Sequence, residues 1–252
     1  MSFKNYIVQI SDLHLFGDKN KKINGANSYK NLENVFNSLT ALKEKPELII
    51  VTGDLSQDCT FESYQHLANL LNKSDIKYYL LPGNHDDVSV VNKVFELNWE
   101  KDTVEFSFDF KDWFFVFIDT SIYPEDSGSL SLDQLLSFKN ILKLNKNKKT
   151  IVFMHHHPIL INSPLMNTMI LKENEKFNNV IKENQQVKAV LFGHVHQVFE
   201  KTINETFYAS CPATCYQIQP GCENFTVEKT IPGYRLLDLE KDKVTSRVVW
   251  VE

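Results

Sequence analysis

Five short apolar runs in this chain each end in a compact polar cluster, and this pattern most constrains the fold. In chain order the clusters are Asp12-Leu13-His14, Gly53-Asp54, Gly83-Asn84-His85-Asp86, His155-His156-His157 and Gly193-His194-Val195-His196. In an open α/β sheet, the loops at the carboxyl ends of the strands converge on a shared ligand site. If each run is a strand, five strands deliver their polar side chains to one edge, and the chain must fold around that edge.

The apolar runs are rich in β-branched and aromatic residues and alternate with helical patterns, which is typical of strands joined by crossover helices. This pattern predicts strands at residues 6–10, 48–51, 78–81, 114–118, 151–154, 189–192, 205–209, 234–239 and 244–251. Helical spacing and a capping box at Ser131 predict helices at residues 28–41, 61–71, 131–144 and 172–183. The tail strands have no helices between them, so we expect a second sheet to pack on the first.

The predicted fold class is α/β, a two-sheet β-sandwich flanked by helices. The chain has 252 residues and a hydrophobic content of 42%, which is enough for one substantial core. No internal repeat, low-complexity tract or linker rich in Pro, Gly and Ser marks a boundary. We therefore expect a single domain over residues 1–252.

Composition and charge narrow the class of partner. No stretch approaches the roughly 20 apolar residues of a membrane span, and the N-terminus lacks the apolar segment of a signal peptide. We therefore expect a cytoplasmic protein that does not bind a membrane. The net charge is −5, and the basic residues form no stripe that would bind nucleic acid. A small-molecule phosphate ester fits this charge distribution better than a nucleic acid does. The sequence leaves homodimerisation open.

The four cysteines are too few and too unevenly placed for a disulfide scaffold, so we expect thiols. Three of them lie close together, at Cys211, Cys215 and Cys222. A zinc or redox site in this group lacks the Cys-x-x-Cys pair or spaced histidine that would support it.

The side chains of the five clusters are imidazoles, carboxylates and an amide, and these groups suit Mn, Fe or Zn. Two such ions held about 3.5–4 Å apart clamp the attacking and leaving oxygens of an in-line displacement at phosphorus. The whole ordered set therefore predicts two divalent metal ions per chain, of Fe, Mn or Zn. Gly53, Gly83 and Gly193 each precede a cluster residue, and we expect tight turns there that a side chain would obstruct.

In composition and order, the clusters resemble the signature of the calcineurin-like metallophosphoesterases: Asp-x-His, Gly-Asp, Gly-Asn-His-Asp/Glu, His and Gly-His-x-His. By this resemblance, the ligands of the first metal are Asp12, His14, Asp54 and His196. The ligands of the second metal are Asp54, Asn84, His155 and His194. Asp54 would bridge the ions because its two oxygens can fix their separation. The resemblance also implies a hydroxide between the ions as the nucleophile.

The catalytic residues implied by the same resemblance are Asn84, His85 and Asp86. His85 and Asn84 would contact the phosphate, His85 would protonate the leaving oxygen, and Asp86 would orient His85 or support its charge. Only one histidine of the triplet can occupy the family's single position, and we predict His155 because it follows the strand directly. For His156 and His157, a supporting role and direct substrate contact both stay open.

The segments around the clusters, and the tail from Pro212 through Ile231-Pro232-Gly233-Tyr234-Arg235, resemble bacterial class III 3′,5′-cyclic AMP phosphodiesterases. This resemblance covers nearly the whole chain and implies hydrolysis of 3′,5′-cyclic AMP to 5′-AMP. A glycerophosphodiesterase or a small phosphodiesterase of broad specificity would share the metal motifs. A metal-free interaction module on the same fold would usually have lost ligands.

Preference for a cyclic nucleotide requires residues that contact the base, and aromatic faces are suited to a purine. Phe16 follows the first cluster, and Tyr216 lies in the tail segment that resembles the subgroup. We predict both as substrate-binding residues, with ordinary core packing as the alternative for each.

Overall fold

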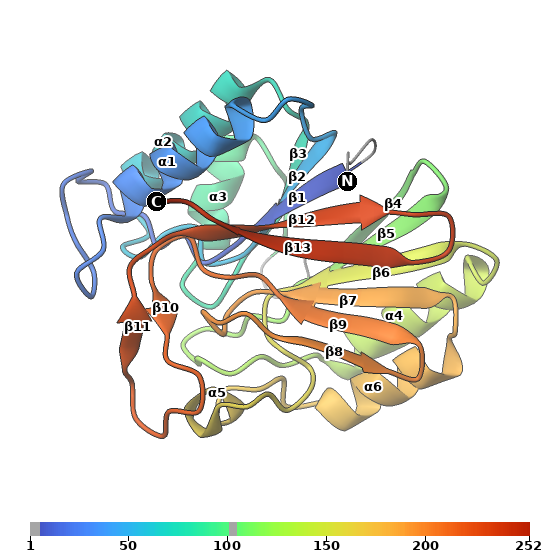
Figure 1. The fold of residues 1–252 in the computed structure, drawn as a ribbon. Coiled ribbons are helices and arrows are strands. Elements are labelled where there is room, and N and C mark those ends of the chain that lie inside the picture. Colours follow the sequence, from blue (N-terminus) through green and yellow to red (C-terminus); the bar gives the residue numbers. More distant parts are fainter. Residues whose placement is uncertain (1–5, 101–104) are drawn as a thin grey trace.

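The computed structural model describes residues 6–100 and 105–252 as two mixed sheets that pack face to face (Figure 1). Across the first sheet the strands are β13 (Val244–Trp250), β12 (Gly233–Leu239), β1 (Tyr6–Ile10), β2 (Leu48–Thr52) and β3 (Tyr78–Leu81). Across the second they are β4 (Glu105–Phe110), β5 (Trp113–Ile118), β6 (Lys149–Met154), β7 (Val187–Phe192), β9 (Thr206–Ser210) and β8 (Glu200–Ile203). A small hairpin pairs β10 (Gln217–Ile218) with β11 (Val227–Lys229).

Helices cover the outer face of each sheet (Figure 1). Those packed with the first sheet are α1 (Ser28–Thr40), α2 (Phe61–Ser74) and α3 (Val88–Phe95). Those packed with the second are α4 (Leu132–Leu144) and α6 (Asn174–Glu183), whereas the short α5 (Pro164–Asn167) lies beside the β10–β11 hairpin (Figure 1). The predicted α/β sandwich with flanking helices is confirmed. None of the described helices has the length and apolar character needed to cross a bilayer.

Strand β5 illustrates how the layers form, because successive side chains in a strand point to opposite faces. Phe115 and Phe117 pack between the two sheets, against residues such as Phe153 of β6. Phe114 and Val116 point the other way, into the core beneath α4 and α6. A strand that is buried on both faces has no polar positions, so it appears in the sequence as a continuous apolar run.

Each of the nine predicted strands is present, but the tail strands do not build a separate sheet. β12 pairs antiparallel with β1 and β13 follows it, whereas β9 extends the second sheet beside β7. The tail therefore extends both sheets. β12 and β13 run antiparallel to their neighbours and need no crossover helix, whereas β9 runs parallel to β7 and follows it through β8, with which it pairs antiparallel. The sequence prediction missed β4, β8, β10, β11, α3 and α5.

The parallel strands β1, β2 and β3 of one sheet and β6 and β7 of the other direct their carboxyl ends to one region. Gln9 links the two sheets there, since its Nε2 donates to Thr52 Oγ1 at 3.0 Å and to Phe192 O at 3.2 Å. Arg235 makes a second link, from β12 to Ser210 O of β9 at 2.9 Å from Nε. These buried contacts fix the distance between the strand ends that carry the predicted ligands.

Candidate metal centre

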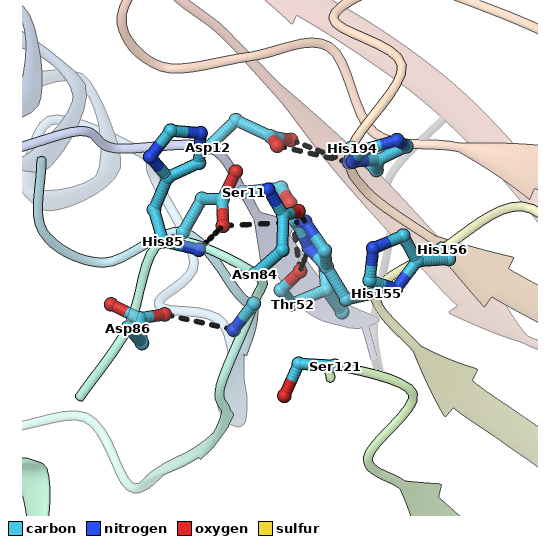
Figure 2. A network of polar contacts seen from close by, with 12 residues as sticks. Ser11, Asp12, Thr52, Asn84, His85, Asp86, Ser121, His155, His156 and His194 are labelled. Atoms are coloured by element: carbon cyan, nitrogen blue, oxygen red, sulfur yellow. Dashed lines mark hydrogen bonds and ion pairs between the residues drawn. The ribbon is translucent and has the colours of Figure 1, made fainter. Parts of the chain in front are cut away.

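The predicted ligands converge where these strand ends meet (Figure 2). One such residue closely follows each of five strands: Asp12 after β1, Asp54 after β2, Asn84 after β3, His155 after β6 and His194 after β7. All of them except the partly exposed Asn84 are buried. Five segments that are far apart in the sequence therefore contribute to one site, as the pattern of clusters predicted.

Tight turns bring the backbone close to this centre. Gly53 has a φ of +92°, and a Cβ there would lie 2.4 Å from Nδ1 of His155. A Cβ on Gly193 would lie 2.0 Å from Oγ of Ser11, and one on Gly83 would meet Asp54 at 2.2 Å. The expected obstruction of a side chain at all three glycines is confirmed.

The predicted ligands themselves carry backbone strain. Positive φ angles between 45° and 68° occur at five of them: Asp12, His14, Asp54, His194 and His196. Left-handed backbone is unfavourable for residues other than glycine and persists where the surroundings enforce it. These loops are thus held in one conformation that aims the side chains inward.

The first predicted set comes together, with ligand atoms all within 4.8 Å of one another: Asp12, His14, Asp54 and His196. Nε2 of His14 lies 3.1 Å from Nε2 of His196. Nδ1 of His14 faces Gln57 Oε1 at 2.7 Å, and Nδ1 of His196 faces Tyr216 O at 2.9 Å. Acceptors at both Nδ1 atoms put the protons there, so both Nε2 lone pairs point into the site.

Two lone pairs at this separation repel each other unless a cation lies between or beside them. Burial lowers the pKa of both His14 and His196 to about 4, although Asp54 opposes this effect. Both rings are therefore neutral near pH 7, which is the form that binds a metal ion. The first set fits a cation by its donor chemistry.

The second predicted set surrounds Nε2 of His155. This atom lies 3.4 Å from Asp54 Oδ1 and 3.1 Å from Asn84 Oδ1, while Nδ1 faces Thr52 O at 2.7 Å. Burial lowers the pKa of His155, but the Asp54 carboxylate outweighs burial and the pKa is raised to about 9. Oxygens gathered around one ring nitrogen thus favour positive charge there, which a bound metal ion would supply in place of a proton.

His194 completes this half of the centre. Its backbone N–H donates to both carboxylate oxygens of Asp12, at 2.9 and 3.1 Å (Figure 2). Its ring belongs to a buried group with His155 and His156 whose ligand atoms lie within 4.8 Å of one another. Burial holds the pKa of His194 well below its usual range, so this ring is also a neutral donor.

Asn84 and His85 lie at the open side of the centre and line a pocket together with His14 and His196. The backbone N–H of His85 donates to Asp54 Oδ1 at 3.0 Å, and its ring packs edge-on against His14. This arrangement leaves His85 on the pocket lining and outside the two predicted ligand sets.

Asp86 does not orient His85 as predicted. Its carboxylate accepts hydrogen bonds from the backbone N–H groups of Leu55 at 3.1 Å, Ser56 at 3.0 Å and Gly83 at 2.8 Å. The Tyr64 hydroxyl donates to it at 3.2 Å. The turn after Gly83 directs Asp86 back toward the backbone, so this residue joins the two loops that carry Asp54 and Asn84.

His156 and His157 are completely buried and lie behind His194, with ring centroids 4.5 and 5.8 Å from it. His156 Nδ1 lies 2.8 Å from the Thr120 hydroxyl. Among the described residues that line the pocket, neither histidine is included. Of the two roles left open by the sequence, the structure favours support of His194.

The cysteines do not form a site of their own in the described part of the chain. Cys211 and Cys215 are buried thiols, and burial raises the pKa of each. Cys211 Sγ donates to Gln9 O at 3.2 Å. Cys215 Sγ lies 3.8 Å from Nδ1 of His196, behind the ring and on the side away from Nε2.

The pocket beside the centre has an accessible volume of about 220 Å³ and an apolar wall. Side chains of α5 and of the hairpin region make this wall: Leu165, Met166, Met169, Tyr216, Ile218 and Phe225. Asp126 adds one carboxylate. The sequence patterns missed these residues, except for Tyr216, and they also missed Gln57.

Tyr216 and Phe16, the two predicted base contacts, lie in different surroundings. Tyr216 lines the pocket, next to the half-exposed Phe225 at 6.0 Å between ring centroids. Phe16 is buried, carries Nζ of Lys21 over its ring at 4.3 Å, and is absent from the described pocket lining. Its burial away from the pocket does not support the prediction that Phe16 contacts the base.

Comparisons with known proteins agree with this geometry. A family model for calcineurin-like phosphoesterases matches residues 6–198. A 3′,5′-cyclic-nucleotide phosphodiesterase of Nostoc sp. is 35% identical over 94% of this chain and 88% of its own. The 3′,5′-cyclic adenosine monophosphate phosphodiesterase CpdA of Escherichia coli is 29% identical over 94% of this chain and 86% of its own.

Among solved structures, a dimetal phosphatase of Danio rerio aligns with a TM-score of 0.71 and 13% identity, covering 98% of this chain and 99% of that one. A purple acid phosphatase of Lupinus luteus gives the same TM-score at 12% identity, over 98% of this chain and 51% of that one. These structures share the fold. The family match and the sequence relatives go further, and the chain belongs to the calcineurin-like phosphoesterase family.

Proposed function

We propose that this chain is a binuclear metal-dependent phosphodiesterase that hydrolyses 3′,5′-cyclic AMP to 5′-AMP. One observation carries the proposal: the pocket joins the two predicted ligand sets to an apolar wall that includes Tyr216 and Phe225. The first part suits a phosphate and the second suits the flat face of a base. The names of the Nostoc and Escherichia coli relatives support the same substrate class.

Asp12, His14, Asp54 and His196 would hold one ion, and Asp54, Asn84, His155 and His194 the other. Two bound divalent ions activate water for attack on phosphorus and neutralise the charge of the phosphate. The family match and the donor chemistry of both sets support this cofactor, of Fe, Mn or Zn. The position of the apolar wall supports a substrate orientation in which the base lies against this wall, away from the ions.

The chain's own residues then bind the phosphate and move a proton. The side chains of Asn84 and His85 would bind the phosphate oxygens from the open side of the centre. His85 would give its ring proton to the 3′ oxygen as the bond to phosphorus breaks, because an alkoxide is a poor leaving group at neutral pH. The apolar wall would exclude water from the base side of the substrate.

A glycerophosphodiesterase is the alternative that shares these ligands. A glycerol headgroup would meet a wall that, apart from Asp126 and the Tyr216 hydroxyl, is apolar, so its hydroxyls would lose most of their hydrogen bonds to water without replacement. Turnover of cyclic AMP and of glycerophosphoethanolamine on one metal-loaded sample tests the proposal. A higher kcat/KM for the glycerophosphodiester would overturn it.

A further inference from the structure

Gln57 lies between two histidines that need opposite protonation patterns. Its Oε1 lies 2.7 Å from Nδ1 of His14, and its Nε2 lies 3.4 Å from Nδ1 of His85. An amide oxygen only accepts a hydrogen bond and an amide NH2 only donates one. The single side chain therefore presents an acceptor to one ring and a donor to the other.

We propose that Gln57 is a positioning residue that fixes the tautomers of His14 and His85 in opposite senses. The amide oxygen places the His14 proton on Nδ1, which leaves the Nε2 lone pair facing the ligand set. The amide NH2 donates to the Nδ1 lone pair of His85, which places the His85 proton on Nε2. One ring is thereby prepared to bind a cation and the other to give up a proton. This inference rests on the proposed role of His85 as the proton donor.

The reverse orientation of the amide conflicts with the binding of a cation by His14. Its NH2 would then face Nδ1 of His14 and move the ring proton to Nε2. That atom lies 3.1 Å from Nε2 of His196, whose own lone pair points inward because Nδ1 faces Tyr216 O. The His14 proton would occupy the space where the other three groups of the set converge. Only the acceptor orientation keeps all four donors available.

The backbone around Gln57 is fixed by other contacts. Its N–H donates to Leu15 O at 2.8 Å, and the neighbouring Ser56 is tied to Asp86. Replacement of the side chain should therefore leave the loop in place. Gln57→Met keeps the approximate length and removes both polar ends. Gln57→Glu keeps an acceptor toward His14 but places an acceptor opposite His85.

Nitrogen-15 NMR of the imidazole rings in the protein loaded with Zn²⁺, which is diamagnetic, tests the tautomers directly and does not depend on turnover. In the parent protein we expect the proton on Nδ1 of His14 and on Nε2 of His85. In Gln57→Glu we expect the His85 ring to become protonated at Nδ1 while His14 is unchanged. A His85 ring that stays protonated at Nε2 alone would overturn the assignment.

Metal titration and turnover give two further readouts for Gln57→Met. Loss of a partner behind a metal-binding histidine typically weakens metal affinity roughly 10–100-fold, so calorimetry should detect that change. At saturating metal, turnover of cyclic AMP should fall more than that of methyl 4-nitrophenyl phosphate, whose leaving group needs no proton. In a His85→Ala background, Gln57→Met should cause no further fall.

Gln65→Met is the matched control, because Gln65 lies on α2 and its side chain contacts Asn69. It should match the parent protein in all three readouts. Unchanged metal affinity together with unchanged turnover in Gln57→Met would show that Gln57 supports neither ring. If no form of the protein hydrolyses cyclic AMP but the tautomers shift as expected, the proposed substrate fails and the role of Gln57 stands.

Discussion

Oδ1 of Asp54 lies 3.4 Å from Nε2 of His155, while the other carboxylate oxygen is turned to the opposite half of the centre, 3.4 Å from Nε2 of His14. Burial opposes the charge of Asp54, but His155 and His14 hold the pKa of this carboxyl well below its usual range. Asp54 is therefore ionised and offers one oxygen to each half. This geometry is what a carboxylate shared between two cations requires.

Asp54→Ala should remove both metal ions or nearly so, because both ligand sets lose their shared carboxylate. Elemental analysis of the purified variant measures the metal content per chain. Asp112→Ala, an exposed aspartate in the turn between β4 and β5, is the control and should match the parent protein. Full metal content in Asp54→Ala would contradict the bridging assignment.

His85→Ala should lower turnover of cyclic AMP by roughly 10²–10⁴-fold, the range expected for loss of a general acid. Metal content should stay close to that of the parent protein, since the ring lies outside both ligand sets. Steady-state kinetics and elemental analysis on the same sample separate the two effects. Loss of the ions, or turnover at the parent rate, would show that the role is wrong.

Asp86→Ala should destabilise the fold, because Leu55, Ser56 and Gly83 each lose an acceptor for a backbone N–H. An unpaired buried donor costs roughly 1–3 kcal/mol, so the loss of three acceptors should lower the free energy of unfolding by at least about 3 kcal/mol. Urea denaturation with and without metal measures this change. If turnover falls and stability does not, Asp86 acts on His85 after all.

Much of the fold could be predicted because the central strands are buried on both faces. The continuous apolar segment Trp113–Ile118 is readily recognised as a strand from sequence. Glu200–Ile203 is instead a largely exposed edge strand with two charged residues, so its sequence gives no such signal. The hairpin strand Gln217–Ile218 and helix Pro164–Asn167 are too short to show a period. Such elements form because tertiary contacts stabilise them, and these contacts cannot be predicted from the local sequence.

The convergence of the predicted ligands could be anticipated because five of them closely follow strands and the order of the clusters matches a family signature. The role of Asp86 depends on the direction in which the turn after Gly83 points, and sequence spacing does not specify that direction. Gln57 and the apolar wall were missed for a related reason. An uncharged amide or a methionine is common in any loop, so only its position in space indicates a role.

The last prediction concerns the base. Phe225 is 51% exposed and lies beside Tyr216 on the pocket wall, so its ring is free to support a base without being needed for the core. Stacking of a base on an aromatic ring contributes roughly 1–3 kcal/mol. Phe225→Ala and Tyr216→Ala should therefore raise KM for cyclic AMP by roughly 5–100-fold. Phe16→Ala should instead lower stability with little effect on KM, because its ring lies away from the pocket.

The 3′,5′-cyclic phosphate of methyl riboside separates support of the base from support of the fold, because it has the same phosphate ring and no base. Parallel kinetics on the two substrates should show the loss for cyclic AMP alone. Phe61→Ala removes a phenylalanine of similar exposure, 48%, at the start of α2 and is the control. Equal losses on both substrates in Phe225→Ala would mean that this wall holds the loops around the centre and does not contact the base.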